Sequence, residues 1–378
     1  MHKSLHIVIY SRFKVTATGG VERTVGSIAQ ALRARGNICE VITGDDLGCS
    51  ADTAWRKVAA CMADHWTSAK HRYDVAVFNG EYGYKARGGR IVNIFHGTAL
   101  GYLCATRTLL PIRSLLARGL LSGVPQWLAG LRHTRVAVSD SAAHDLRRFY
   151  GLTGISVIPN GVDIELFAAG SKSESRTELG IPPHARVYLY ASRVEPGKCP
   201  LFLQAWANAL LPDEHLLVAT DKPVTVTGRL TTMVNVPREQ MPRLFRAADV
   251  FLMPSYYEGC SYAVIEAMAC ECMLVASPVG HAQSIIREQP ILKECFEPER
   301  SATAFLGRAR GLLDQSALAA HIRVAGREYV VKHNTLERMG EAYGNLFLRL
   351  LLDGNRTVGK PAAYPITPTQ HAESNTLS

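Results

Sequence analysis

The stretch PSYYEGCSYAVIEAMA, residues 254–269, carries Glu258 and Glu266, two glutamates eight positions apart. It overlaps the apolar run DVFLMPS, and this order predicts the end of a buried strand followed by a helix that begins near Ser261. Glu258 would then lie in the loop between them, and Glu266 about two turns along the helix. Ligands of open parallel sheets bind beyond the carboxyl ends of the strands, so the stretch predicts a binding site at that edge.

Short strand-like runs alternate with longer helical patterns along the rest of the chain. The first half contains HIVIY, CEVIT, DVAVFN, RIVNIFHG and RVAVSD, and its first helix is predicted over 21–35. The second half contains RVYLYASR, HLLVAT, DVFLMPS and MLVAS, with a helix predicted over 200–209 and further helices to about residue 352. This alternation is typical of βαβ units. We therefore expect two similar α/β halves with parallel sheets, joined near residue 170 at the turn-rich VIPNGVDIELFAAGSKSES.

Length and composition favour a globular protein of two domains. The chain has 378 residues, of which 47% are hydrophobic and 20% charged, so each half can bury its own core. The N-terminal apolar run HIVIY is too short for a signal peptide, and no stretch has the roughly 20 apolar residues needed to cross a bilayer. Residues 353–378 are polar and lack an apolar period, which predicts a disordered tail.

The cysteines favour an intracellular setting. There are nine, an odd number without a C-x-x-C pair, which argues against a disulfide framework and against a structural metal site. We therefore expect a cytoplasmic protein without bound metal. Cys260, Cys270 and Cys272 are predicted to be small, buried, apolar side chains, because no His or Asp motif accompanies them.

The net charge of +9 is concentrated in one segment, 85–148, which holds ten Lys and Arg residues against Asp140 and Asp145 and so carries +8. Within it apolar residues recur at helical spacing between arginines; they are Leu109, Ile112, Leu115 and Leu116, with Arg107, Arg113 and Arg118. This pattern is typical of a basic amphipathic surface on anionic lipid, and equally of an ordinary helix with a solvated arginine face. No aromatic-interleaved motif or zinc-finger spacing favours nucleic acid as a partner.

Four predicted strand-to-helix loops carry polar or glycine residues suited to a ligand. They are TATGGVER with Gly19 and Gly20, FHGT with His96, YASRVEPGKCP with Arg193 and Lys198, and PSYYEGCS with Glu258, Gly259, Cys260 and Ser261. Each residue alone has an ordinary structural explanation as a turn glycine, a core histidine or a solvated charge. Cations for a diphosphate and carboxylates for sugar hydroxyls together form the set that a nucleotide-sugar site requires.

Several of these stretches resemble the retaining family 4 glycosyltransferases. PSYYEGCSYAVIEAMA is similar to their E-x7-E signature and ASRVEPGKCP to their G-R-x4-K segment, while TGGVERTVGSIAQAL and VIPNGVDIELF are similar to their first loop and interdomain stretch. The resemblance spans about residues 5–350 in the right order. It implies the GT-B fold, in which two Rossmann-like parallel-sheet domains face each other across a cleft. The acceptor-binding domain would be 1–170, the nucleotide-sugar-binding domain 171–335, and a helix at 336–352 would cross back to the first domain.

The resemblance also implies roles for individual residues. Glu258 would bind hydroxyls of the donor sugar, and His96 would lie beside the sugar that is transferred. Arg193 and Lys198 would neutralise the diphosphate and stabilise the charge that develops as it leaves. Glu266 would accept hydrogen bonds from the ribose. The residues expected to bind the donor are Gly19, Gly20, Arg193, Lys198, Gly259, Cys260, Ser261 and Glu266.

Members of this family retain the anomeric configuration, and the leaving phosphate is thought to help remove the acceptor proton, so no dedicated base is implied. The chain has no D-x-D motif, and we expect neither a metal nor another cofactor. It departs from the family pattern in EAMACECMLVASPVGH, where Glu271 replaces a helix-ending Gly, Met273 a Pro and His281 a second Gly. A non-Gly residue in a left-handed cap costs about 1 kcal/mol, so we expect this helix to end in another way.

The nucleotide and the acceptor stay open at this point. The nucleotide could be uridine, guanosine or another. A cell-surface glycan or lipid-linked saccharide acceptor suits the basic first half and would place the protein peripherally on the inner face of the cytoplasmic membrane. A soluble aminocyclitol or other metabolite is the alternative acceptor. A non-catalytic nucleotide-sugar-binding protein and a GT-B sugar epimerase are further alternatives, and the set Arg193, Lys198, Glu258 and Glu266 argues against both.

Overall fold

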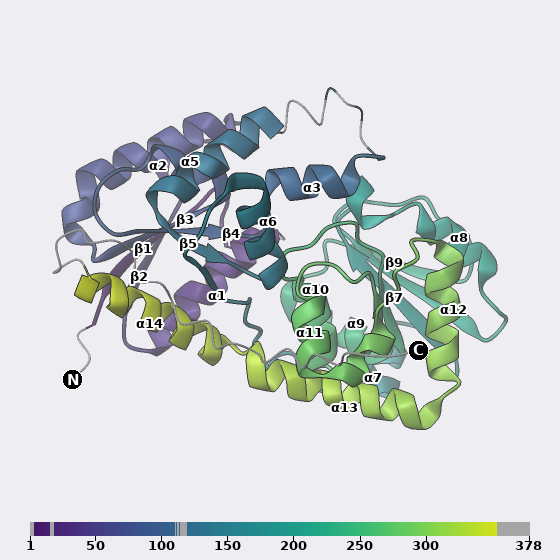
Figure 1. Ribbon diagram of the computed structural model, residues 1–378. Helices are drawn as coiled ribbons and strands as arrows, with labels where there is room; N and C mark the ends of the chain where they lie inside the picture. Colours follow the sequence, from purple (N-terminus) through teal and green to yellow (C-terminus); the bar gives the residue numbers. More distant parts are fainter. Residues whose placement is uncertain (1–3, 16–18, 110, 112, 114–118, 354–378) are drawn as a thin grey trace, which may run out of the picture.

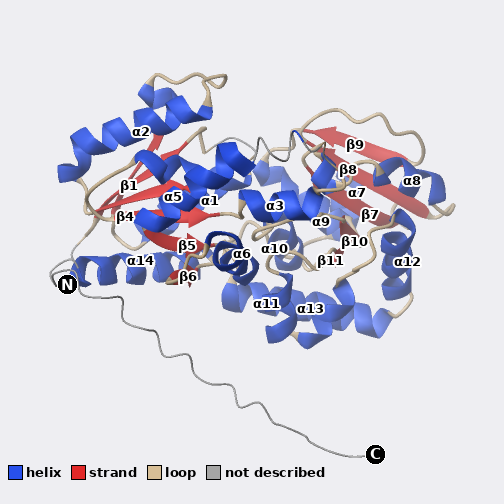
Figure 2. Ribbon diagram, turned by 45° about the horizontal axis from the view of Figure 1, so that its top comes forward, coloured by secondary structure: helices blue, strands red, loops and turns tan. Residues whose placement is uncertain are grey.

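Two parallel β-sheets lie side by side, each covered by helices, in the computed structural model of the chain (Figures 1 and 2). The structure describes residues 4–15, 19–109, 111, 113 and 119–353. The first sheet is formed by the first half of the sequence and the second sheet by the second half. The predicted fold class, two α/β units with parallel sheets, is therefore confirmed.

The first sheet has six strands in the order β2-β1-β3-β4-β5-β6, all parallel. Its central strands are buried along their whole length, which explains why VAVFN and IVNIF read as nearly continuous apolar runs. The chain moves from β1 to one neighbour, β2, and then to the other, β3, so the order reverses at β1. The strands are β1 (His6–Ser11), β2 (Ile38–Thr43), β3 (Val75–Asn79), β4 (Ile91–Phe95), β5 (Thr134–Ala137) and β6 (Ile155–Val157).

The helices of the first half cover both faces of this sheet. α1 buries Val25, Ile28 and Leu32 on one stripe, at the spacing expected of an amphipathic helix. The expected basic amphipathic segment is only partly described, since Ile112, Leu115, Leu116 and Arg118 lie outside the described residues. The helices are α1 (Gly20–Ala34), α2 (Trp55–Ala69), α3 (Ala99–Thr106), α5 (Val124–Arg132) and α6 (Asp140–Tyr150), with a π-helical turn η4 (Gly119–Gly123) before α5.

The second sheet has five parallel strands in the order β11-β10-β7-β8-β9, and its order reverses at β7. The predicted strands of the second half are confirmed, and β9 is an additional one. The strands are β7 (Arg186–Ser192), β8 (Glu214–Thr220), β9 (Leu230–Val234), β10 (Val250–Met253) and β11 (Met273–Ala276). The helices are α7 (Lys172–Glu178), α8 (Phe202–Ala209), α9 (Met241–Ala247), α10 (Tyr262–Ala269), α11 (Ala282–Glu288) and α12 (Ala302–Leu313).

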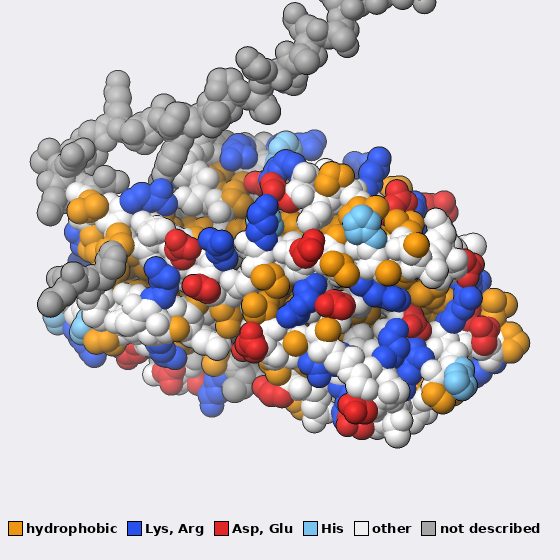
Figure 3. Space-filling model, turned by 90° about the horizontal axis from the view of Figure 1, so that it is seen from below, with side chains coloured by type: hydrophobic (Ala, Val, Ile, Leu, Met, Phe, Trp, Pro, Cys, Tyr) orange, Lys and Arg blue, Asp and Glu red, His pale blue; other side chains and the backbone are white. Residues whose placement is uncertain are grey.

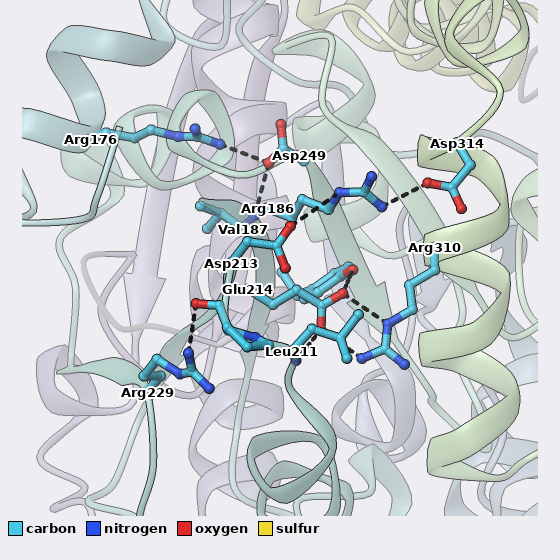
Figure 4. Close-up of polar contacts among 12 residues, drawn as sticks. Arg176, Arg186, Val187, Leu211, Asp213, Glu214, Arg229, Asp249, Arg310 and Asp314 are labelled. Carbon is cyan, nitrogen blue, oxygen red and sulfur yellow. Dashed lines mark hydrogen bonds and ion pairs between the residues drawn. The ribbon is translucent and has the colours of Figure 1, made fainter. Parts of the chain in front are cut away.

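Two carboxylates, each paired with its own arginine, stabilise the amino ends of strands in the second sheet (Figure 4). Glu214, at the start of β8, accepts hydrogen bonds from Arg310 Nε at 2.8 Å and from Tyr188 Oη at 2.7 Å. Asp249, just before β10, accepts from Arg176 Nη2 at 2.7 Å and from the backbone N–H of Val187 at 2.8 Å. Burial alone would raise the pKa of each carboxyl, but these bonds outweigh it and lower both pKa values, for Asp249 together with the Lys172 ammonium 2.6 Å from Oδ1, which has the largest lowering effect. Because the partners satisfy both charges, this end of the sheet is structural.

The last two helices, α13 (Ser316–His333) and α14 (Leu336–Asp353), run beneath the second and then the first sheet (Figure 1). Between them the chain pairs with the interdomain stretch, because Val162 N–H donates to Asn334 O at 2.7 Å and Leu336 N–H donates to Val162 O at 3.2 Å. α14 then packs on α1, and a Cβ on Gly340 would lie 2.9 Å from the Cβ of Ala31. The predicted domain limits stay a prediction, and of the expected tail 353–378 residues 354–378 lie outside the described residues.

The end of α10 corrects one expectation. Glu271 lies in the left-handed region with φ of 57°, although it is not glycine. Its N–H donates to Met268 O at 3.1 Å, and the next N–H, that of Cys272, donates to Ala267 O at 2.9 Å. These two bonds form a Schellman motif, so the helix keeps the ordinary left-handed end and the prediction of a different one is wrong. Contacts with Arg327 offset the backbone strain at Glu271. Arg327 Nη1 donates to Ala269 O, and its Nε lies 3.9 Å from the Glu271 carboxylate.

Surface charges are mixed on the face seen from below in Figure 1, where Lys and Arg side chains alternate with Asp and Glu (Figure 3). No helix within the described residues is both long and apolar enough to cross a membrane.

Candidate active site

A cavity of about 650 Å³ lies between the carboxyl ends of the two sheets, and both halves of the chain contribute to its walls. This is the location expected for a ligand of doubly wound sheets, since the strand order reverses at β1 in one sheet and at β7 in the other. The structure brings all the residues predicted for the site to this cavity. They are Gly19, Gly20, His96, Arg193, Lys198, Glu258, Gly259, Cys260, Ser261 and Glu266. Their individual roles stay predictions.

The loop after β10 and the first turn of α10 form one wall. Ser261 is the residue that precedes α10, yet its side chain makes no capping bond to the helix. Its hydroxyl instead lies 3.4 Å from the sulfur of Met253. The first N–H groups of a helix have no partner within the helix and carry partial positive charge. Since residues 259–263 line the cavity, these uncapped amides are available to an anion there.

Lys198 and Glu258 form an ion pair inside the cavity. Lys198 ends the short 3₁₀ turn η5 (Pro196–Lys198) after β7, and Glu258 comes from the loop after β10, the strand beside β7. Their side chains are 17% and 13% exposed. Although the sequence suggested different ligands for the two, the structure holds them together, because a lysine and a carboxylate in a partly dehydrated site attract each other strongly.

Arg193 lies at the rim of the cavity and has a partner that the sequence analysis did not identify. Its Nη1 is 2.9 Å from Glu195 Oε1, and its side chain is 50% exposed. The loop between them is fixed to the neighbouring strand, since Val194 N–H donates to Asp221 Oδ1 at 2.7 Å. The guanidinium is thus near the cavity but more exposed to water than the Lys198 ammonium.

His96 follows β4 and is half-buried. Its Nε2 lies 2.8 Å from Asn79 Oδ1, and Asn79 Nδ2 in turn donates to Tyr10 O at 2.9 Å. Asn79 therefore accepts through Oδ1, and His96 must donate from Nε2. Burial lowers the pKa of His96 to about 4, so at neutral pH the ring is uncharged and its Nδ1 is an acceptor. The sequence analysis did not identify Asn79 as a site residue, although a polar residue at the carboxyl end of the apolar run VAVFN could have indicated it.

The loops that carry His96 and Glu258 are joined directly across the cavity. The hydroxyl of Tyr257 accepts a hydrogen bond from Thr98 N–H at 2.8 Å and donates to Asp145 Oδ2 at 2.7 Å. A side chain at Gly259 would clash with the backbone carbonyl of His96, so only glycine permits this approach. The sequence pattern gave no indication that Tyr257 would connect the two halves.

Two residues of GGVER, Glu22 and Arg23, were also missed, although they lie within three positions of the predicted Gly20. Arg23, in the first turn of α1, pairs with Glu266 of α10. Glu22 is buried against Gly19, where any side chain would clash with its carboxylate, and burial raises the pKa of Glu22. A side chain at Gly19 would therefore displace the Glu22 carboxylate from its buried position.

The cavity has no candidate metal site among the residues that the structure describes. Among the described residues, no cluster of three or more His, Cys, Asp or Glu side chains could hold a metal ion. Cys260 is buried, and burial raises its thiol pKa to about 12, so its backbone rather than its sulfur is suited to a ligand.

Two family models match the chain. The model described as Glycosyltransferase Family 4 matches residues 18–166, and the model described as Glycosyl transferases group 1 matches residues 185–315. A D-inositol 3-phosphate glycosyltransferase from Mycolicibacterium gilvum is 32% identical over 167 residues, which are 39% of this chain and 38% of that protein. The match therefore spans less than half of the length of this curated relative.

Solved structures share the fold over nearly the whole chain. Sucrose-phosphate synthase from Thermosynechococcus elongatus superposes with a TM-score of 0.78 at 20% identity, covering 92% of this chain and 99% of that chain. Anabaena HepE in complex with UDP and glucose superposes with a TM-score of 0.69 at 16% identity, covering 91% and 99%.

Two facing parallel sheets with a cavity between their carboxyl ends, and a fold shared with solved structures that include the glycosyltransferase WaaG, define a protein of the GT-B class. Its two halves each match one of the two family models. The chain belongs to glycosyltransferase family 4.

Proposed function

We propose that the protein transfers a sugar from a nucleotide-diphosphate sugar to an acceptor hydroxyl, with retention of the anomeric configuration. The observation that carries this proposal is the composition of the cavity. Lys198 and the uncapped amides of α10 line the cavity together with the carboxylates Glu258 and Glu266, and Arg193 lies at its rim. A diphosphate requires the cations and amides, and sugar hydroxyls are well bound by the carboxylates.

In this proposal each group has a separate task. Lys198 and the α10 amides bind the diphosphate and stabilise the negative charge that grows on it as the glycosidic bond breaks. Arg193 leaves Glu195 to reach the same oxygens. Glu258, held by Lys198, accepts hydrogen bonds from hydroxyls of the donor sugar. Neutral His96 adds an acceptor on the side of the first sheet. The acceptor attacks from the face that the diphosphate leaves, and a diphosphate oxygen takes its proton.

The donor nucleotide is best sought first among uridine diphosphate sugars. HepE, whose fold this chain shares, is described in complex with UDP and glucose. The base would lie toward the part of the cavity lined by Thr220, Asn235 and Met241, beyond the ends of β8 and β9.

For the acceptor we propose a lipid-linked or cell-surface saccharide, reached while the first half rests on an anionic membrane. Four exposed apolar side chains recur about one helical turn apart on η4 and α5: Leu120, Val124, Trp127 and Leu131, which are 67%, 45%, 39% and 52% exposed. Cations lie at the end of this stripe, since Arg87 Nη1 and Arg132 Nη1 both donate to Tyr84 O, at 3.0 and 2.7 Å. An exposed apolar stripe beside clustered arginines is suited to the interface of an anionic leaflet.

A soluble acceptor is the second candidate, and one observation favours it. The curated relative that is 32% identical over 38% of its length is named a D-inositol 3-phosphate glycosyltransferase. That name describes an enzyme whose acceptor is a small cyclitol phosphate. Sedimentation with anionic and neutral vesicles at low and high salt separates the two candidates. Salt-sensitive binding to anionic vesicles, weakened by Trp127→Ser, supports the membrane candidate. Equal and negligible binding to both vesicle types supports the soluble one.

Nucleotide release tests the enzymatic proposal itself. The purified chain is incubated with UDP-glucose, UDP-galactose, UDP-N-acetylglucosamine and GDP-mannose, with and without candidate acceptors, and free nucleoside diphosphate is measured. Release that depends on the acceptor and is lost in Lys198→Met supports a transferase. Thermal stabilisation by a nucleotide sugar without release would indicate a non-catalytic binding protein, and release without an acceptor requirement would favour an epimerase or a hydrolase.

A further inference from the structure

Arg23 reaches from one half of the molecule to the other at the cavity wall. It belongs to the first turn of α1, over the first sheet, and its Nη1 lies 3.2 Å from Oε1 and 3.3 Å from Oε2 of Glu266 on α10, over the second sheet. The Arg23 side chain is 18% exposed and the Glu266 side chain 1%. Both residues line the cavity. Glu266, the carboxylate predicted to bind ribose, is therefore engaged by a cation from the opposite half.

The stability of α1 does not explain an arginine at this position. The N-terminal end of a helix carries partial positive charge, so a cation in the first turn is unfavourable to the helix. The compensating interaction is the one with Glu266. Among the described residues the guanidinium makes no other hydrogen bond, so Nη2 and Nε keep their donors free at the cavity wall.

Neighbouring contacts fix the distance between Arg23 and Glu266 independently of the ion pair. Thr24, the next residue of α1, has its hydroxyl oxygen 3.3 Å from Asn160 Oδ1, and shares its one hydroxyl proton between this oxygen and Gly20 O at 2.9 Å. Asn160 Nδ2 donates to Cys260 O at 2.8 Å, at the start of the segment that leads into α10. The first turn of α1 is thus held against α10 through the interdomain stretch, and Arg23 meets Glu266 in a prearranged position.

We propose that Arg23 is a positioning residue of the nucleotide site, supplied by the first half of the molecule to Glu266 of the second half. Nη1 uses one lone pair on each oxygen of Glu266, which leaves others for the two ribose hydroxyls and holds the carboxylate in one orientation. The free donors on Nη2 and Nε face the ribose and diphosphate of the nucleotide. This inference rests on the proposed function and adds that nucleotide affinity depends on both halves.

Calorimetric titration of UDP, GDP and ADP into the full chain tests the proposal. Arg23→Met is expected to weaken binding of the preferred nucleotide about tenfold or more, because a hydrogen bond to a charged group is lost. Arg23→Lys, which keeps the charge but not the fork, should lie between. In turnover measurements Arg23→Met should raise the donor KM while kcat stays within about twofold. In a Glu266→Gln background Arg23→Met should have a smaller effect, because its partner is already altered.

Arg287→Met is the matched control. Arg287 Nη2 lies 3.2 Å from Asp140 Oδ2 and so joins α11 to α6 across the same two halves, but neither residue lines the cavity. This variant should bind nucleotide like the wild type, and thermal melts verify that all variants are folded. Equal weakening in Arg287→Met and Arg23→Met would overturn the proposal, because any loss of contact between the halves would then suffice. Unchanged or tighter binding by Arg23→Met overturns it too. If the wild type binds none of the three nucleotides, the proposed function itself fails.

Discussion

Replacing Lys198 with Met removes the cation that the cavity places beside Glu258 while keeping most of the length of the side chain. We expect nucleotide release from the accepted donor to fall 10²-fold or more, because losing one preorganised donor to developing charge costs about 3 kcal/mol and each 1.4 kcal/mol is about tenfold. The Glu258 carboxylate, whose side chain is 13% exposed, also loses its partner. An unpaired charge in such a site costs about 1–3 kcal/mol, so the free energy of unfolding should fall as well.

These two effects are separated by the double variant Lys198→Met/Glu258→Gln. It has no unpaired charge, so its free energy of unfolding should return to within about 1 kcal/mol of the wild type, whereas its activity should stay low. Urea unfolding gives the stability, and steady-state release of nucleoside diphosphate gives the activity. Lys222→Met, at an exposed lysine that follows β8, is the control and should behave as the wild type. The reasoning is refuted if Lys198→Met keeps a tenth or more of the activity, or if the double variant recovers it.

Tyr257→Phe removes the hydroxyl that joins Thr98 to Asp145, so urea unfolding should show that the free energy of unfolding falls by about 1–3 kcal/mol. Steady-state assays should show a lower kcat with little change in donor KM. An unchanged free energy of unfolding would mean that this hydroxyl does not hold the loops together. Glu271→Gly should raise the free energy of unfolding by about 1 kcal/mol, since it relieves the left-handed strain, and a decrease would show that the contact with Arg327 outweighs that strain. His96, with its pKa lowered to about 4, should show no NMR titration above pH 5, and a midpoint near its ordinary value of about 6.5 would contradict its burial. Because the unfolded chain takes up this proton more readily, His96 makes the free energy of unfolding fall as the pH drops from about 6.5 to about 4.

The positions of the predicted site residues were accessible to sequence analysis because they depend on local patterns. Glu258, Lys198 and His96 each follow an apolar run, and the carboxyl ends of parallel strands lie at one edge of a sheet. Their partners could not be predicted in the same way. Tyr257 and Asp145 are 112 positions apart, and Arg23 and Glu266 are 243 apart, and no local period relates them.

The sequence by itself determined the alternation of strands and helices, the division into two similar halves and the sheet edge at which the cavity lies, since burial of apolar runs and turn residues act over a few neighbouring positions. It could not decide how the two halves meet. The tertiary structure places Lys198 against Glu258, Arg23 against Glu266 and Tyr257 between Thr98 and Asp145. It also keeps Glu271 in a left-handed cap that its own side chain disfavours. The contacts of Arg23 and Tyr257 depend on the docking of one sheet beside the other, whereas those of Lys198 and Glu271 depend on packing within the second half. In each case the energy of a charge or a strained residue is set by the groups that surround it after the chain has folded.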